Sequence, residues 1–257
     1  MSKNETLLEV KDVKQFRGYM VAKELEEKVI EVCNHFPSYE RDYLVDQLMR
    51  SAQSVKKCVV IAEQYFIREK FNQYSIAIGS SKEVSTWLDI SFRQGYISEE
   101  KFKELDGLSR YVVAILTKTL ANICTNEGKG MNLPSPYTPE LSNFGVYKDS
   151  LMLVEKVYEV TRGREFWREK SLLFGLRGIS GSVAANLSES NQLYILRKFK
   201  FLNNSLEALS ALVSQLESSL SKGGITEEIF LEIEELAVSI ERRIKRMLKN
   251  ISYQKEN

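Results

Sequence analysis

The chain has 257 residues, of which 43% are hydrophobic and 28% are charged, a balance typical of a globular protein and not of a disordered one. The formal net charge of +1 excludes a polycation, so contact with nucleic acid would have to depend on local basic patches. The sequence has neither a signal peptide nor a membrane-spanning apolar run, and its three cysteines lack CxxC spacing. We therefore expect a cytoplasmic protein with free thiols.

The sequence matches itself at one fixed offset, close to half the length of the chain. The run Ile97-Ser98-Glu99-Glu100 recurs as Ile225-Thr226-Glu227-Glu228, and Glu27-Lys28-Val29 recurs as Glu155-Lys156-Val157. An offset of this size is the length of a small domain, whereas solenoid repeats have periods of roughly 20–50 residues. The pattern predicts two copies of one domain, over residues 13–124 and 145–252. A linker rich in Gly, Pro, Ser and Asn joins them over residues 125–144.

Apolar spacing predicts four helices in the first copy. The first helix ends before Phe36-Pro37, and the second runs from about residue 39 to about residue 65. The third helix carries an apolar seam from Ile67 to Phe92 and ends at Gly95. The fourth begins at Ser98-Glu99-Glu100, which supplies a side-chain cap and two anions near the positive end of the helix.

The second copy shows the same pattern. Its first two helices are predicted at about 146–162 and 166–191, a heptad seam then runs from Ile195 to Leu220, and Gly223-Gly224 ends it. Gly175, Gly178 and Gly181 recur at intervals of three on one helix face, which favours close helix packing over a phosphate loop. The sequence predicts an all-α fold of two tandem up-down antiparallel four-helix bundles.

Each copy keeps one of two short sequence motifs and has largely lost the other. On the second helix, the later copy has Ser182-Val183-Ala184-Ala185-Asn186 and Glu189, whereas the first copy keeps only Ser54-Val55 of this motif. On the third helix, the first copy has Gly79-Ser80 and Glu83, and the later copy keeps only small and apolar positions. Each copy has lost a different motif, which indicates that the copies no longer do identical work. The residues expected at helix interfaces are Ser54, Gly79, Ser80, Glu83, Ser182, Asn186 and Glu189.

These motifs resemble the four-helix-bundle proteins encoded in intervening sequences of 23S ribosomal RNA. The relatives of that family include the accessory variability protein of diversity-generating retroelements. The resemblance implies a homo-oligomer. In the retroelement branch, it also implies a reverse transcriptase and an RNA as partners.

The search for catalytic residues yields no candidate. His35 is the one histidine and has no cysteine or second histidine at metal-ligand spacing, and no phosphate-binding loop is present. The sequence therefore predicts a protein that is not an enzyme and that needs no cofactor, metal or small-molecule substrate.

Basic clusters are the remaining functional signal. A solvated helix face explains any single cluster, but their separation from acidic segments such as 227–241 creates local patches that can hold phosphates. A further cluster crowds a loop, with Arg162, Arg164, Arg168 and Lys170 around Phe166 and Trp167. The residues predicted to contact nucleic acid are Lys56, Lys57, Arg177, Arg197, Lys198, Lys200, Arg242, Arg243, Arg246 and Lys249.

The preferred hypothesis is a non-catalytic oligomeric scaffold that binds RNA or DNA through basic helix faces and serves a reverse transcriptase as an accessory. The alternative is a protein–protein adaptor with no role for nucleic acid, which would hold its partner on small-residue helix faces. Salt separates the two hypotheses, because phosphate contacts weaken steeply with salt and apolar docking changes little.

Overall fold

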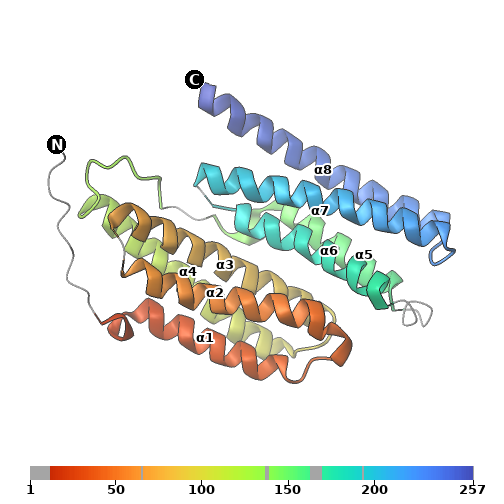
Figure 1. The fold of residues 1–257 in the computed structure, drawn as a ribbon, viewed down its shortest axis with the longest axis horizontal. Coiled ribbons are helices and arrows are strands. Elements are labelled where there is room, and N and C mark those ends of the chain that lie inside the picture. The colour runs from red at the N-terminus through yellow and green to blue at the C-terminus, as the bar shows by residue number, and fades with distance from the viewer. Residues whose placement is uncertain (1–11, 65, 137–138, 163–169, 193, 257) are drawn as a thin grey trace.

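The computed structural model describes residues 12–64, 66–136, 139–162, 170–192 and 194–256. Long helices dominate this part of the chain, which contains no β-strand, so the predicted all-α fold is confirmed. None of these helices combines the length and the apolar character needed to cross a lipid bilayer. The helices shown in Figure 1 are α1 (Arg17–Cys33), α2 (Asp46–Ala62), α3 (Ile67–Arg93), α4 (Glu99–Thr125), α5 (Gly145–Val160), α6 (Lys170–Ser190), α7 (Ile195–Ser221) and α8 (Glu227–Glu256).

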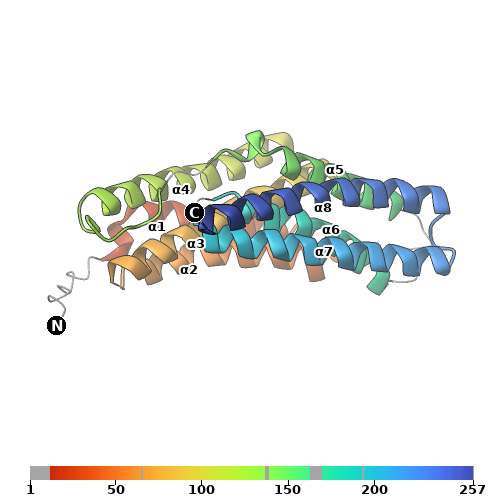
Figure 2. The same cartoon turned by 90° about the horizontal axis from the view of Figure 1, so that it is seen from above.

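The helices form two four-helix bundles. In the first bundle, α1 and α3 each contact both α2 and α4, and in the second bundle, α5 and α7 each contact both α6 and α8. Figures 1 and 2 show the helices of each bundle running alternately up and down along a common direction. The predicted domain limits remain a prediction. The helices lie within those limits, except that α4 ends at Thr125 and α8 extends to Glu256.

The fixed offset of the sequence recurs in the positions of the helices. α1 begins at Arg17 and α5 at Gly145, and the starts of α3 and α7, like those of α4 and α8, are separated by the same interval. Gly95 and Gly223 follow the third helix of each bundle with φ of 74° and 71°. Glycine adopts this left-handed conformation without a steric penalty, so both helices end at corresponding points.

The second helix differs from its predicted form. The chain enters α2 through a 3-10 turn over Ser38–Glu40 and a π-helical turn over Arg41–Val45, where a single helix from about residue 39 was expected. A π-helical turn inserts an extra residue into the helical path, and such turns occur frequently at functional sites. Here the turn brings Tyr43 into contact with α6 in the second bundle.

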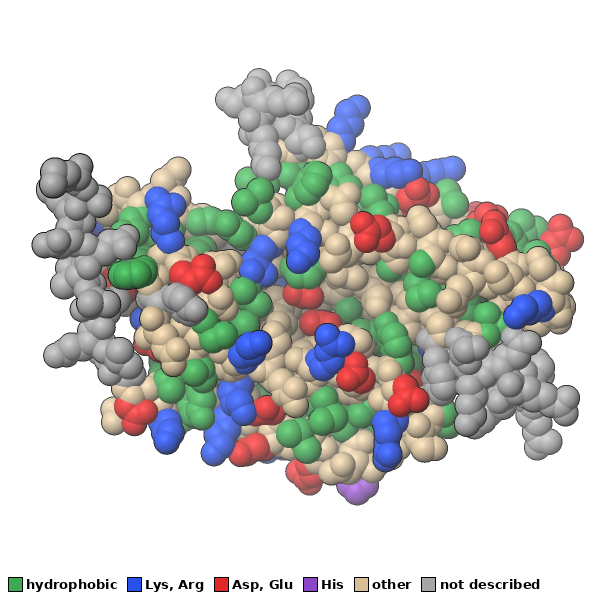
Figure 3. Space-filling view, in the orientation of Figure 1, with side chains coloured by type: hydrophobic (Ala, Val, Ile, Leu, Met, Phe, Trp, Pro, Cys, Tyr) green, Lys and Arg blue, Asp and Glu red, His purple; other side chains and the backbone are tan. Residues whose placement is uncertain are grey.

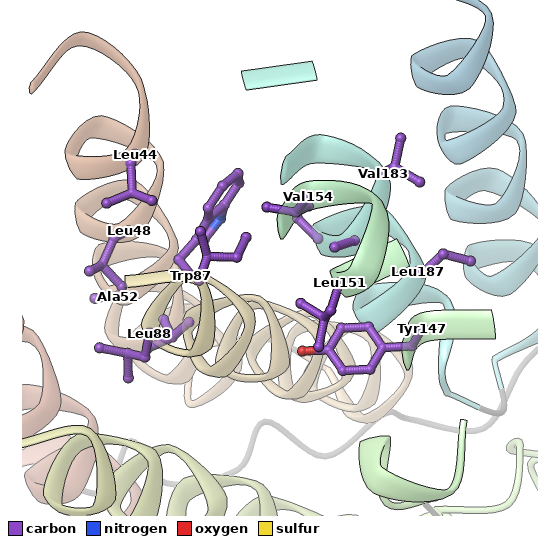
Figure 4. Packing of buried hydrophobic residues seen from close by; sticks show 14 of the residues in the cluster. Leu44, Leu48, Ala52, Trp87, Leu88, Tyr147, Leu151, Val154, Val183 and Leu187 are labelled. Carbon is purple, nitrogen blue, oxygen red and sulfur yellow. The ribbon is translucent and has the colours of Figure 1, made fainter. Parts of the chain in front are cut away.

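The two bundles share one continuous apolar core. α3 of the first bundle packs against α6 and, over a smaller area, against α5 of the second. Figure 4 shows Trp87 of α3 between Leu44 and Leu48 on one side and Val154 of α5 on the other. Trp87 is only 1% exposed, and its ring packs against residues of both bundles. Its burial therefore stabilises the contact between the bundles as well as the core of the first bundle.

Candidate functional site

The joint between the bundles, defined as the contact of α6 with α3 and with the turn at Arg41–Val45, depends on two glycines. A Cβ atom at Gly178 would overlap the ring of Tyr43, and one at Gly181 would lie 2.5 Å from the ring of Trp87. The two rings meet edge to face, with centroids 5.9 Å apart. The interpretation of these glycines as positions of close helix packing is therefore confirmed.

The phenol of Tyr43 adds polar contacts to the joint. Its hydroxyl donates to the carbonyl oxygen of Gly178 and lies 2.5 Å from the Oγ of Ser182. Burial raises the pKa of Tyr43 to about 12, so the phenol stays protonated and keeps its donor at neutral pH.

The two divided motifs meet at the joint. A Cβ atom at Gly79 of α3 would lie 3.2 Å from Oε2 of Glu189 on α6, so the glycine makes room for this carboxyl group. Glu83 lies one helical turn beyond Gly79 and accepts a hydrogen bond from Nε1 of Trp87 at 3.3 Å. The motif kept by the first copy thus contacts the motif kept by the second copy.

The other motif residues stabilise contacts inside each bundle. The Oγ atoms of Ser54 on α2 and Ser80 on α3 are 2.8 Å apart. Asn186 donates to the carbonyl oxygen of Ser182 at 2.8 Å and accepts from Nδ2 of Asn204 on α7 at 3.4 Å. These polar groups have partners, as buried polar groups in helix interfaces require.

The two carboxyl groups of the joint resist ionisation. Burial is the main cause that raises the pKa of both Glu83 and Glu189 above the ordinary value of a glutamate. The charge of Glu83 raises the pKa of Glu189 further, while Arg197 and Lys200 act in the opposite direction. The joint therefore carries less negative charge at neutral pH than two ordinary glutamates would.

Arg177 has a structural role, which corrects the prediction that it contacts nucleic acid. Its Nη1 lies 2.7 Å from Oε1 of Glu40, and the two side chains are 5% and 1% exposed. Its Nε donates to the hydroxyl of Thr161 at 2.9 Å, and its guanidinium lies over the ring of Tyr158. The side chain is enclosed by partners from both bundles and has no surface to offer to a phosphate.

Four more of the predicted basic residues are engaged or partly enclosed. Lys56 pairs with Glu26, and Arg243 pairs with Asp149. Lys198 and Arg197 are partly buried, and burial lowers the pKa of both side chains. These cations are less available to a ligand than exposed, unpaired ones.

Four cations from both bundles gather along the joint and form a surface that we call the basic seam. It consists of Arg50 and Lys57 on α2 and Arg197 and Lys200 on α7. The charge of Arg50 acts on Glu83, and those of Arg197 and Lys200 act on Glu189, which places these three cations around the carboxyl groups of the joint. Lys57 joins them because its charge and that of Arg197 both act on the Cys58 thiol of α2. Figure 3 shows Lys and Arg side chains on both sides of the joint between the bundles, with acidic side chains between them.

Two of the four cations of the basic seam, Lys57 and Lys200, are not neutralised locally. Lys57 and Lys200 are exposed and form no ion pair with any carboxylate in the described part of the chain. Arg50 has a side chain 69% exposed and lies 3.5 Å from Asp46, whereas Arg197 donates to Oδ1 of Asn72 at 3.2 Å. Arg50 was not among the residues predicted to contact nucleic acid, although it precedes Lys57 by seven residues and therefore lies on the same helix face.

A second basic surface lies on α8. Arg242, Arg246 and Lys249 are exposed at helical spacing, whereas Ile240 and Ile244 are fully buried. This stripe faces outward, as its spacing predicts. The predicted loop cluster lies almost entirely outside the described residues, which include Arg162 and, at the start of α6, Lys170. Arg162 donates to Oε1 of Gln94 at 3.1 Å.

The pocket beside α3 is too small for a metabolite. Its volume is about 60 Å³, and Lys82, Asp106, Arg110 and Glu140 are among the residues that line it. Small-molecule sites are several times larger, at roughly 300 Å³ or more. Burial lowers the pKa of Lys82 to about 8, but its ammonium group donates to two backbone carbonyls and so ties the linker to the end of α6.

The described residues contain no group of three or more His, Cys, Asp or Glu side chains that could hold a metal ion.

Residues 14–118, which span α1 to α3 and most of α4, match the family model described as the 23S rRNA-intervening sequence protein. No curated protein and no solved structure matches the chain.

Proposed function

Since residues 14–118 belong to the 23S rRNA-intervening sequence protein family, we propose that the chain is a non-catalytic helical scaffold that binds the backbone of nucleic acid along the basic seam. The observation that carries this proposal is the gathering of Arg50, Lys57, Arg197 and Lys200 from two bundles around the joint. The cations of α2 and those of α7 lie far apart in the chain, and only the joint brings them together.

The proposed contact is electrostatic. Phosphates that meet Lys and Arg side chains release condensed counterions, so binding is strong at low salt and tolerant of base sequence. The raised pKa values of Glu83 and Glu189 support this reading, because a carboxyl group with a raised pKa ionises less readily and so repels a phosphate less than an ordinary glutamate would. A near-neutral chain can thus present a cationic surface.

The partner class follows from the resemblance of the motifs to the accessory variability protein of diversity-generating retroelements. We propose a reverse transcriptase as the protein partner and its RNA as the nucleic acid. A scaffold that holds a phosphate backbone without reading bases suits the positioning of a template of varied sequence.

Charge reversal tests the proposal. The variant Lys57→Glu/Lys200→Glu is expected to weaken binding of a short labelled single-stranded RNA about tenfold or more at low salt, measured by fluorescence anisotropy. The matched control is Lys103→Glu/Lys118→Glu, which makes the same charge change on exposed positions of α4. Figure 2 shows α4 on the side of the first bundle away from α2. Equal loss in the two variants would refute a role for the basic seam.

An adaptor function is the second candidate, and one observation favours it. Three large apolar side chains are exposed at the start of α7: Ile195 at 40%, Leu196 at 59% and Phe199 at 42%. Exposed apolar groups close together on a surface mark protein contacts in many proteins. Partner binding that is unchanged by salt and lost in Leu196→Ser/Phe199→Ser would favour the adaptor over the nucleic-acid scaffold.

A further inference from the structure

The contact at the joint is head-to-tail. Since the helices of the two bundles correspond at the fixed offset of the sequence, α6 is the counterpart of α2, and α7 is the counterpart of α3. The joint therefore places the third helix of one bundle on the second helix of the other. A head-to-tail contact uses two different surfaces, and it builds rings or filaments unless something stops it. One chain uses each surface once and leaves the corresponding faces of α2 and α7 open.

The open face of α2 lacks the shape that the joint requires. Gly178, Gly181 and Ala185 of α6 correspond to Arg50, Gln53 and Lys57 of α2. The α6 residues give the Tyr43 and Trp87 rings their space, because a Cβ at either glycine would already collide with a ring. The α2 residues are long, polar and exposed, so they fill the space that must stay open for a third helix to approach as closely as α3 approaches α6.

The open face of α7 lacks the anchor. Trp87 of α3 corresponds to Gln215 of α7, and Glu83 corresponds to Ala211. Gln215 does not project as the tryptophan does, since it packs inward against Gly175 of α6. Without a large aromatic residue at position 215, the part of α7 that corresponds to the joint has no side chain to insert between the helices of a second copy.

We infer that the joint is a subunit contact completed within one chain, and that substitutions on α2 and α7 prevent a further copy of the chain from adding through it. The chain then contains both halves of the contact, and the open face of α2 has taken a different task. Two of the residues that block a further copy, Arg50 and Lys57, are cations of the basic seam. The inference about assembly does not depend on nucleic-acid binding, because it rests on side-chain shape alone.

The mass of the full chain in solution tests this inference. We expect light-scattering chromatography to give about 29.6 kDa, the mass of one chain, at micromolar concentrations. The test variant is Ala211→Arg, an exposed change on the open face of α7 that suits a helix and leaves the joint itself unaltered. If the unmodified protein has a larger mass and the variant Ala211→Arg has the mass of one chain, the inference is overturned, because that result would show that α7 binds another copy.

A larger mass that Ala211→Arg leaves unchanged would support the inference, since the copies would then associate through another surface. The homo-oligomer implied by the family resemblance would in that case use such a surface. A matched change at Ser239, an exposed position on α8, controls for the effect of a new surface charge. Loss of assembly in Ser239→Arg but not in Ala211→Arg would assign the contact to α8.

Discussion

Replacing Arg177 by alanine is expected to cause one of the largest losses of stability available in this protein. The guanidinium is the cationic partner of Glu40, which is 1% exposed, and it also donates to the side chain and backbone of Thr161. Removing one partner of a buried ion pair leaves an uncompensated charge, at a cost of about 3–5 kcal/mol. With a urea dependence of roughly 2 kcal/mol per molar, the unfolding midpoint should fall by about 1.5–2.5 M.

Urea unfolding followed by circular dichroism measures this change. The control is Arg242→Ala, an exposed arginine on α8, which should change the free energy of unfolding by about 0.5 kcal/mol or less. The double variant Glu40→Gln/Arg177→Met should recover much of the loss, because it leaves no buried charge unpaired. A single variant Arg177→Ala as stable as Arg242→Ala would refute the reasoning.

Three further predictions follow from the same contacts. Gly178→Ala should destabilise the protein by about 1–3 kcal/mol through overlap with a tyrosine ring. Gly107→Ala, where a Cβ meets open space, should stabilise it by about 0.5–1 kcal/mol; equal effects in urea titrations would contradict the account of the joint. Because burial raises the pKa of Glu189 in the folded state, the folded protein binds this proton more tightly, and stability falls as pH rises above the ordinary value of 4.5. Glu189→Gln should therefore raise Tm at about pH 8 and have little effect near pH 4.5, and a gain of equal size at both would argue against burial as the cause. Burial raises the pKa of Cys33 to about 12, whereas Cys124 is partly exposed, so Cys124→Ser should abolish the fastest thiol reaction of the native protein. Fast modification of Cys33 would contradict its burial.

The sequence predicts the helices well, because local signals define them. Apolar spacing locates each long helix, and Gly95 and Gly223 end the third helix of each bundle at corresponding points. The π-helical turn at Arg41–Val45 has no such signal, since its position depends on the contact that Tyr43 makes with another bundle. Local propensity alone would have continued α2 through it.

The candidate site is harder to predict from the sequence. A motif of small residues indicates that another helix packs closely against it, but the motif does not identify which helix that is. Gly79 and Glu189 belong to motifs of different copies, and only the fold places them together. Arg177 was predicted to contact nucleic acid, but it is buried against Glu40, which lies 137 residues earlier in the chain and which no local pattern pairs with it. Arg50, in contrast, could have been found from its spacing to Lys57.

The salt dependence of RNA binding tests the central claim most directly. Plotting log Kd against log salt between about 50 and 200 mM gives a slope of roughly 0.7 for each single-strand phosphate contact. We predict a steep slope for the unmodified protein, and a slope shallower by about 1.4 for Lys57→Glu/Lys200→Glu, if each cation meets one phosphate. The α4 control variant should keep the original slope. Binding that does not change with salt, or an unaltered slope in Lys57→Glu/Lys200→Glu, would contradict the proposal that the basic seam holds nucleic acid.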